Sequence, residues 1–241
     1  MAATAIAVIV PLALFVIKDG PEVLGLEPDG GPGDANDPPI ATPDNDVDSQ
    51  AWTLGTAMRT VAFWGLSACL SLVMMAQGAF LVHQVMFLQS GLGLLGAASI
   101  VIVTTIMGMA GRAGFLLIGD RLTVRWWATA MFAIQALSFA ILALGETPFW
   151  LTVGSALFGL TMGIVVILQP LATAAVFGQE SFGRVYGGVY MSIRIGAGIG
   201  PLVAGLLVVA AGGYKNVWLL MAGALLAGMA CIPWAMAKPK R

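Results

Sequence analysis

The sequence predicts an all-α membrane protein, a six-transmembrane-helix bundle built as a 3+3 inverted repeat and preceded by a partial helix and a disordered linker. The first observation behind this prediction is composition, because 59 % of the 241 residues are hydrophobic and only 10 % are charged. The second is charge placement, since residues 61–241 carry only 12 charged side chains. A soluble domain has about a quarter of its residues charged. The third is that the apolar residues form stretches of membrane-spanning length.

Six apolar stretches follow residue 60, and each approaches or exceeds the roughly 20 residues that a spanning helix needs. They are residues 61–87, 95–118, 126–144, 149–177, 185–211 and 217–235. We therefore expect a six-helix transmembrane domain at residues 61–235. A basic tail at residues 236–241 follows it.

The segments before residue 61 have two different characters. Residues 1–17 are uncharged and apolar, but at about 1.5 Å per residue they are short for a full crossing. They predict the end of a transmembrane helix. Residues 18–60 contain nine acids and a Gly-Gly-Pro-Gly run, which is typical of a disordered linker. Within this linker Thr53 is a candidate N-cap for a short surface helix that continues through Arg59.

Basic residues near helix ends predict the orientation. One side of the membrane receives most of them, and the opposite side receives only Lys215. The residues on the first side are Lys18, Arg59, Arg121, Arg125, Arg184, Lys238, Lys240 and Arg241. Because cytoplasmic loops carry the excess of Lys and Arg, we expect the linker and the C-terminus to be cytoplasmic.

Two arginines lie inside the predicted spans, where a charge is costly and marks a candidate functional site. Arg194 is near the middle of the fifth span, and Arg112 is about two turns inside the second. In one interpretation they face a water-filled cavity and bind an anionic substrate group, for which guanidinium is suited. In the other they bond backbone carbonyls across a helix interface, and Arg112 extends its side chain to the cytoplasm.

Polar side chains also lie on the first and fourth spans. Gln77 and Gln84 share one face of the first span, with His83 about 100° away, and Gln169 belongs to a broken polar stripe on the fourth. Such residues either line a cavity or bond a neighbouring helix, and both interpretations remain open for the glutamines. His83 either titrates near neutral pH as part of a gate or bonds a neighbour.

The order of helix types repeats within the six spans. The first three run from a polar helix with Gln to a glycine-rich helix with Arg and then to a mostly apolar one, and the last three follow the same order. Three crossings reverse the direction of the chain, so the two units have opposite orientations, as in the inverted repeats of secondary transporters. The glycines of the second and fifth spans favour close helix packing.

Six short segments, grouped as four cues along the chain, resemble the C-terminal half of a major facilitator superfamily (MFS) transporter, in the bacterial branch of monocarboxylate and oxalate/formate carriers. They are KDGPEVLG at residues 18–25, AQGAFLVHQV at 76–85, GRAG and GDRL at 111–114 and 119–122, and FGRVYG with GAGIGP at 182–187 and 196–201. The resemblance implies that the first and fourth spans line a central cavity, and that the second and fifth face the other half. It also implies alternating access driven by a proton or an exchanged solute.

The sequence therefore predicts a secondary transporter of a small organic solute, here as its C-terminal half in a bacterial inner membrane, and the two arginines favour an anionic solute. The alternative is a half-size or truncated protein that needs a partner N-terminal half. The partners expected are lipid, the solute and that missing half. Eleven basic and twelve acidic residues without a basic stripe speak against nucleic-acid binding. With one His and two separated cysteines, we expect neither an enzyme nor a metal or cofactor site.

Overall fold

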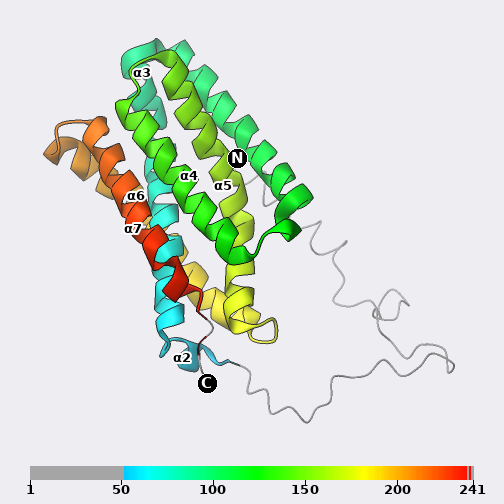
Figure 1. Cartoon of the computed structure of the whole chain (residues 1–241). Coiled ribbons are helices and arrows are strands. Elements are labelled where there is room, and N and C mark those ends of the chain that lie inside the picture. The colour runs from blue at the N-terminus through cyan, green and yellow to red at the C-terminus, as the bar shows by residue number, and fades with distance from the viewer. Residues whose placement is uncertain (1–51, 238, 240–241) are drawn as a thin grey trace, which may run out of the picture. The chain divides into compact units, whose positions relative to one another are not determined.

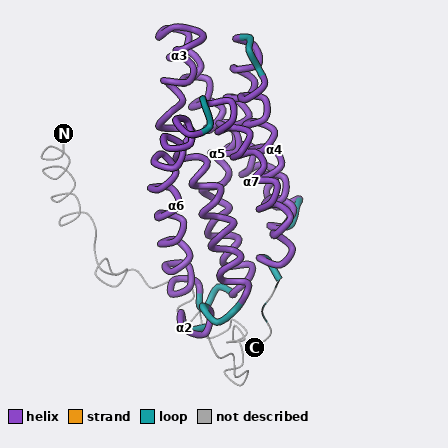
Figure 2. Tube along the Cα trace, turned by 90° about the vertical axis from the view of Figure 1, so that its left-hand side faces the viewer, coloured by secondary structure: helices purple, strands orange, loops and turns teal. Residues whose placement is uncertain are grey.

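The computed structural model describes residues 52–237 and residue 239, and this part of the chain contains helices and no strand. The elements are α2 (Leu54–Ala57), α3 (Val61–Ile118), the 3₁₀ turn η2 (Gly119–Arg121), α4 (Val124–Leu144), α5 (Pro148–Phe177), α6 (Phe182–Ala210) and α7 (Tyr214–Ala235). The five long helices form a bundle (Figures 1 and 2). The predicted partial helix at residues 1–17, nearly all of the linker, and Lys238, Lys240 and Arg241 lie outside the described residues.

Helix α3 makes two of the six predicted crossings. Its 58 residues would extend about 87 Å as a straight helix, far more than the roughly 30 Å of a bilayer core. Gly93 breaks it with φ 70° and ψ 174°, and the chain turns back at that level in Figure 1. We call residues 61–92 the first arm and residues 94–118 the second arm. Five long apolar helices thus supply six crossings, as predicted.

The connection between these two arms differs from the prediction. Residues 88–92 read as a loop in the sequence, yet they remain helical up to Gly93. Ser90 helps, because its hydroxyl donates to the carbonyl of Phe87 at 2.7 Å and so stays within its own helix. Glycine alone adopts positive φ without strain, so one residue makes the turn that a loop was expected to make.

Local sequence explains where several helices begin and end. Thr53 caps α2 with its side chain, and Thr56 completes a reciprocal capping box. This short helix ends at Ala57, two residues before the expected Arg59. Pro148 opens α5, where its missing N–H costs nothing. Gly178 ends α5 with φ 83°, a conformation that favours glycine.

The centre of the bundle is aromatic. Phe80, Phe139, Phe158 and Trp218 are fully buried and come from the first arm, α4, α5 and α7. The Phe80 ring lies 4.3 Å from that of Phe158 and 5.5 Å from that of Trp218, measured between centroids. These rings join helices from both halves of the predicted repeat into one core.

Two pairs of parallel helices approach each other through glycines. In the first pair, the first arm with α6, a methyl group at Gly78 would collide with the carbonyl of Ala197, and one at Gly200 with the carbonyl of Met75. In the second pair, the second arm with α5, a methyl at Gly163 would collide with the carbonyl of Gly108. One at Gly111 would collide with the carbonyl of Leu160. Backbones this close exchange Cα–H···O contacts and dispersion.

The two pairs follow the same spacing, which gives the inverted repeat a residue-level form. Positions 75 and 78 correspond to 160 and 163, 85 residues later, and positions 197 and 200 correspond to 108 and 111, 89 residues earlier. The first crossing is therefore equivalent to the fourth, and the fifth to the second. This is the 3+3 arrangement predicted from helix character alone.

Candidate functional site

Arg194 lies on the exposed side of α6. The residues of α6 that are buried lie on another side of the helix; they are Val185, Val189, Ile193, Gly200 and Ala204. The guanidinium carbon of Arg194 sits 4.8 Å from the centre of the Tyr190 ring, one turn earlier. This cation–π contact fixes the guanidinium over an aromatic face, while the side chain remains exposed.

Arg112 is also exposed, on the second arm. Its stem packs on α5, since a methyl group at Gly163 would lie 3.3 Å from Cγ of Arg112. Among the described residues neither arginine forms an ion pair with a carboxylate. Both positive charges are therefore free to meet an anion from outside this part of the chain.

Gln77 is 2 % exposed, and its Nε2 donates to Oε1 of Gln135 on α4 at 3.3 Å. The structure thus sets Gln77 between the first and third crossings. Gln135 was not among the residues predicted from the sequence, although it is the only amide side chain inside α4. A polar side chain on an apolar span, the signal that indicated Gln77, would have indicated Gln135 as well. Nε2 of Gln135 has no hydrogen-bond partner within the described residues.

Gln84 and Gln169 are both buried and lie 85 residues apart, which is the spacing of the repeat, so they occupy equivalent positions. Oε1 of Gln84 has no hydrogen-bond partner within the described part of the chain. The side chains of the polar stripe around Gln169 are mostly satisfied locally. Thr173 donates to the backbone carbonyl of Gln169 at 3.1 Å, and Thr152 to that of Pro148 at 2.8 Å.

His83 joins three helices at the end of the bundle opposite α2. Its Nε2 lies 3.1 Å from the carbonyl oxygen of Pro201 on α6, and its Nδ1 lies 3.0 Å from the hydroxyl of Tyr214 on α7. A carbonyl only accepts, so Nε2 carries the proton and donates. In the neutral ring Nδ1 then accepts from the tyrosine hydroxyl. Both nitrogens are satisfied without a charge.

The five predicted site residues are therefore distributed over the bundle. Gln77 and His83 make hydrogen bonds to other helices, Gln169 is buried, and Arg112 and Arg194 are exposed on different helices. The described residues show no hydrogen bond or ion pair that joins any two of the five. Of the five, the two arginines are the exposed ones.

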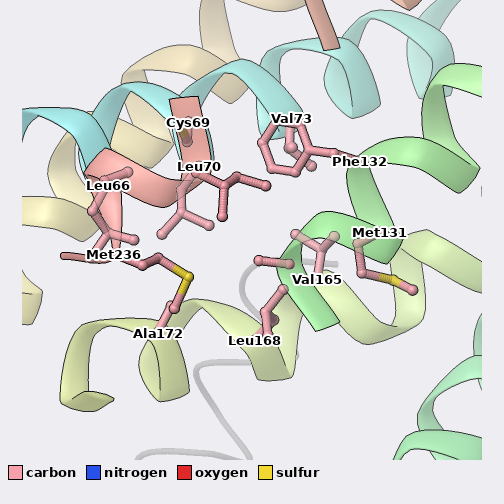
Figure 3. Close-up of a pocket in the computed structure, with 13 residues that line it drawn as sticks. Leu66, Cys69, Leu70, Val73, Met131, Phe132, Val165, Leu168, Ala172 and Met236 are labelled. Atoms are coloured by element: carbon pink, nitrogen blue, oxygen red, sulfur yellow. The ribbon is translucent and has the colours of Figure 1, made fainter. Parts of the chain in front are cut away.

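A small apolar cavity lies between the first arm, α4, α5 and α7 (Figure 3). Its volume is about 20 Å³, and its lining is apolar, with Leu66, Cys69 and Met131 among the side chains. An apolar space of this size stays dry. The cavity is a packing defect of the core and offers no polar group to a charged solute.

A match to the family model of the Major Facilitator Superfamily covers residues 113–241, slightly more than half of the chain. The chain belongs to this superfamily. MFS proteins are membrane transporters, not enzymes, which agrees with five long apolar helices and six crossings. The chain is thus a multi-pass membrane protein of a transporter superfamily. No curated protein matches it, so its branch within the superfamily stays a prediction.

Proposed function

We propose that this chain is the C-terminal half of a secondary active transporter that carries a small organic anion by alternating access. The observation that carries the proposal is the pair Arg112 and Arg194, two exposed guanidinium groups on apolar helices without a carboxylate partner among the described residues. A charge in this setting is expensive unless it faces water or an anion. Guanidinium also binds carboxylate in a bidentate geometry.

The sequence cues give this proposal its finer form. The chain is assigned to the monocarboxylate and oxalate/formate branch in a bacterial inner membrane, with a proton or counter-solute as driving partner. In this proposal the sixth family helix ends in residues 1–17, and the linker is residues 18–60. The transmembrane domain is residues 61–235, and the tail is residues 236–241. Arg194, Arg112, Gln77, Gln169 and His83 are the proposed substrate-binding residues, of which Arg194 is the one to test first.

The test is uptake of labelled organic anions by the intact protein in membranes. We expect Arg194→Ala to lower uptake at least about 30-fold, because removing one partner of a desolvated ion pair costs about 2 kcal/mol or more. Arg184→Ala is the matched control, since Arg184 is an exposed arginine on the same helix, ten residues earlier and at its end. Unchanged kinetics in Arg194→Ala, with normal insertion, would remove Arg194 from the substrate site.

Orientation is the second part of the proposal. Arg59, Arg121, Arg125 and Arg184 lie at the connections on one side of the bundle, and Lys215 lies at the start of α7 on the other. This asymmetry supports a cytoplasmic C-terminus. A tag after residue 241 that becomes accessible to protease only after the cytoplasmic side is opened would agree. Accessibility from the outside would reverse the assignment.

A second candidate, that this chain needs a partner half for any transport, is favoured by the sparse burial of α6. Only five of its 29 residues are buried, whereas 15 of the 30 residues of α5 are. An N-terminal half of six helices is the partner proposed for the uncovered side. An upstream reading frame that encodes these helices, or a co-purified second membrane subunit, would support the pairing. Uptake by the chain alone would contradict it.

A further inference from the structure

Three aromatic rings and an arginine follow one another along α6 at intervals of one helical turn. They are Phe182, Tyr186, Tyr190 and Arg194. We call the three rings the aromatic ladder, and Arg194 lies at its end. The rings of Phe182 and Tyr186 are stacked, with centroids 5.0 Å apart and planes at 13°. Tyr186 and Tyr190 are 5.5 Å apart at 39°, and the Arg194 guanidinium lies over Tyr190 at 4.8 Å.

The ladder differs from the other aromatic residues of the bundle in what its rings touch. The core rings, such as Phe80 and Trp218, contact rings on neighbouring helices. In the described part of the chain, the ring contacts of Phe182, Tyr186 and Tyr190 are with one another and with Arg194. All three rings are half-buried, so each keeps part of its surface open. Their stacking is therefore not a means of joining helices within this unit.

The ladder also has a direction. It begins at the first residue of α6 and ends at Arg194, twelve residues later, a distance of about 18 Å along the helix. This is more than half of a bilayer's hydrocarbon core of about 30 Å. A strip of aromatic surface thus runs from one end of the bundle to a positive charge near mid-membrane.

We propose that the aromatic ladder and Arg194 form the binding surface for an aromatic carboxylate, such as a benzoate-type anion. This inference rests on the proposed function and names the substrate class of the same site. The guanidinium binds the carboxylate, and the face of Tyr190 holds the guanidinium in place. The substrate ring packs against the tyrosine rings in an offset or edge-on geometry, which favours aromatic partners beyond the area that they bury. An aliphatic carboxylate gains the charge pairing only.

The experiment compares two probes of the same charge and similar size, labelled benzoate and labelled cyclohexanecarboxylate, in equilibrium binding to the full chain in lipid nanodiscs. We expect benzoate to bind about 3- to 10-fold more tightly, the ratio that one or two aromatic contacts supply. Arg194→Ala should weaken both probes. Tyr190→Leu should weaken benzoate by about 3- to 10-fold more than cyclohexanecarboxylate, because both probes lose the ring that positions the guanidinium and benzoate also loses an aromatic contact. Tyr190→Phe should keep the preference.

Phe149→Leu is the matched control, because Phe149 is an exposed aromatic residue that pairs with Trp150 outside the ladder, and this change should leave both probes unaffected. If Tyr190→Leu fails to fold, the affinities of Tyr186→Leu and of the unmodified chain for the two probes still test the ladder's role. Equal, Arg194-dependent affinity for both probes would overturn the ladder's role and leave the anion transporter standing. Binding of neither probe, alone or with a co-expressed N-terminal half, would overturn the ladder's role, and loss of uptake of every labelled organic anion would overturn the anion transporter.

Discussion

The two glycine-mediated helix pairs share their backbone contacts but differ in the side chains between them. Each pair places one glycine against a carbonyl of the partner helix, and a second such contact lies three residues away on each helix. At the position equivalent to Arg194, the other pair has Thr105, whose hydroxyl donates to its own helix at 3.0 Å. At the position equivalent to Arg112, which belongs to the second pair, the first pair has Pro201. The repeat thus sets how the helices pack, and the residues that flank the contact points differ between the two pairs.

His83 extends the same contrast to the end of the bundle opposite α2. The position 85 residues later is Leu168, a buried apolar side chain that lines the small cavity of Figure 3. In the first pair this position carries hydrogen bonds to α6 and α7. In the second it carries core packing. Equivalent positions of the two repeats therefore carry interhelical hydrogen bonds in one repeat and a hydrophobic contact in the other.

The largest expected effect breaks the packing that the two pairs share. Gly200→Ala and Gly111→Ala each force a methyl group against a backbone carbonyl, and we expect each to lower the free energy of unfolding by about 1–3 kcal/mol. Thermal unfolding of the purified protein, followed by tryptophan fluorescence, measures this loss. Gly198→Ala and Gly114→Ala are the controls, since nothing lies within 4 Å of a methyl group there. A tolerated Gly111→Ala beside a damaging Gly200→Ala would refute the equivalence of the pairs, because Gly111 and Gly200 are equivalent positions.

A smaller effect concerns the amide pair behind the first arm. Gln77→Leu leaves the buried Gln135 side chain without its partner, and we expect a loss of about 1–2 kcal/mol. The double variant Gln77→Leu with Gln135→Leu should recover most of it, because no buried amide then remains. Gln84→Met should be nearly neutral, since Oε1 of Gln84 lacks a partner already. An additive double variant would show that the two amides do not interact.

The smallest effect sharpens the contrast between His83 and Leu168. Tyr214→Phe removes the hydroxyl that donates to His83, and we expect a loss of about 0.5–1 kcal/mol. Tyr186→Phe is its matched control, because the hydroxyl of Tyr186 makes no hydrogen bond within the described residues. Thermal shift resolves the two variants. Equal shifts for both would mean that the tie at His83 contributes nothing specific to stability.

The sequence predicted the six crossings because hydropathy is a local property, and windows of apolar residues do not depend on tertiary contacts. The bend at Gly93 was missed because Gln89, Ser90 and Gly91 have loop-like composition, whereas a helix needs only its own backbone hydrogen bonds to continue. The repeat was visible in helix character. Its spacing was not, since Met75 and Ala197 correspond to Leu160 and Gly108 and only two of the four positions keep glycine.

The candidate site was predictable in the same uneven way. Arg112 and Arg194 follow directly from the cost of a charge in a membrane. The partner of Gln77 depends on which face of α4 meets the first arm, and no spacing in one helix contains that information. The aromatic ladder was missed because each ring alone reads as ordinary hydrophobic surface. Its meaning comes from the stacking of rings one turn apart and from the arginine at its end.

The bend at Gly93 has a practical consequence for anyone who modifies this protein. A methyl group at Gly93 would meet no atom within 4 Å, yet its φ of 70° excludes other residues without strain. An epitope or a fluorophore inserted at Gly93 would therefore strain the backbone, although open space surrounds the residue. A reporter belongs in the connection between α5 and α6, where Gln179 and Glu180 are exposed and outside both helices.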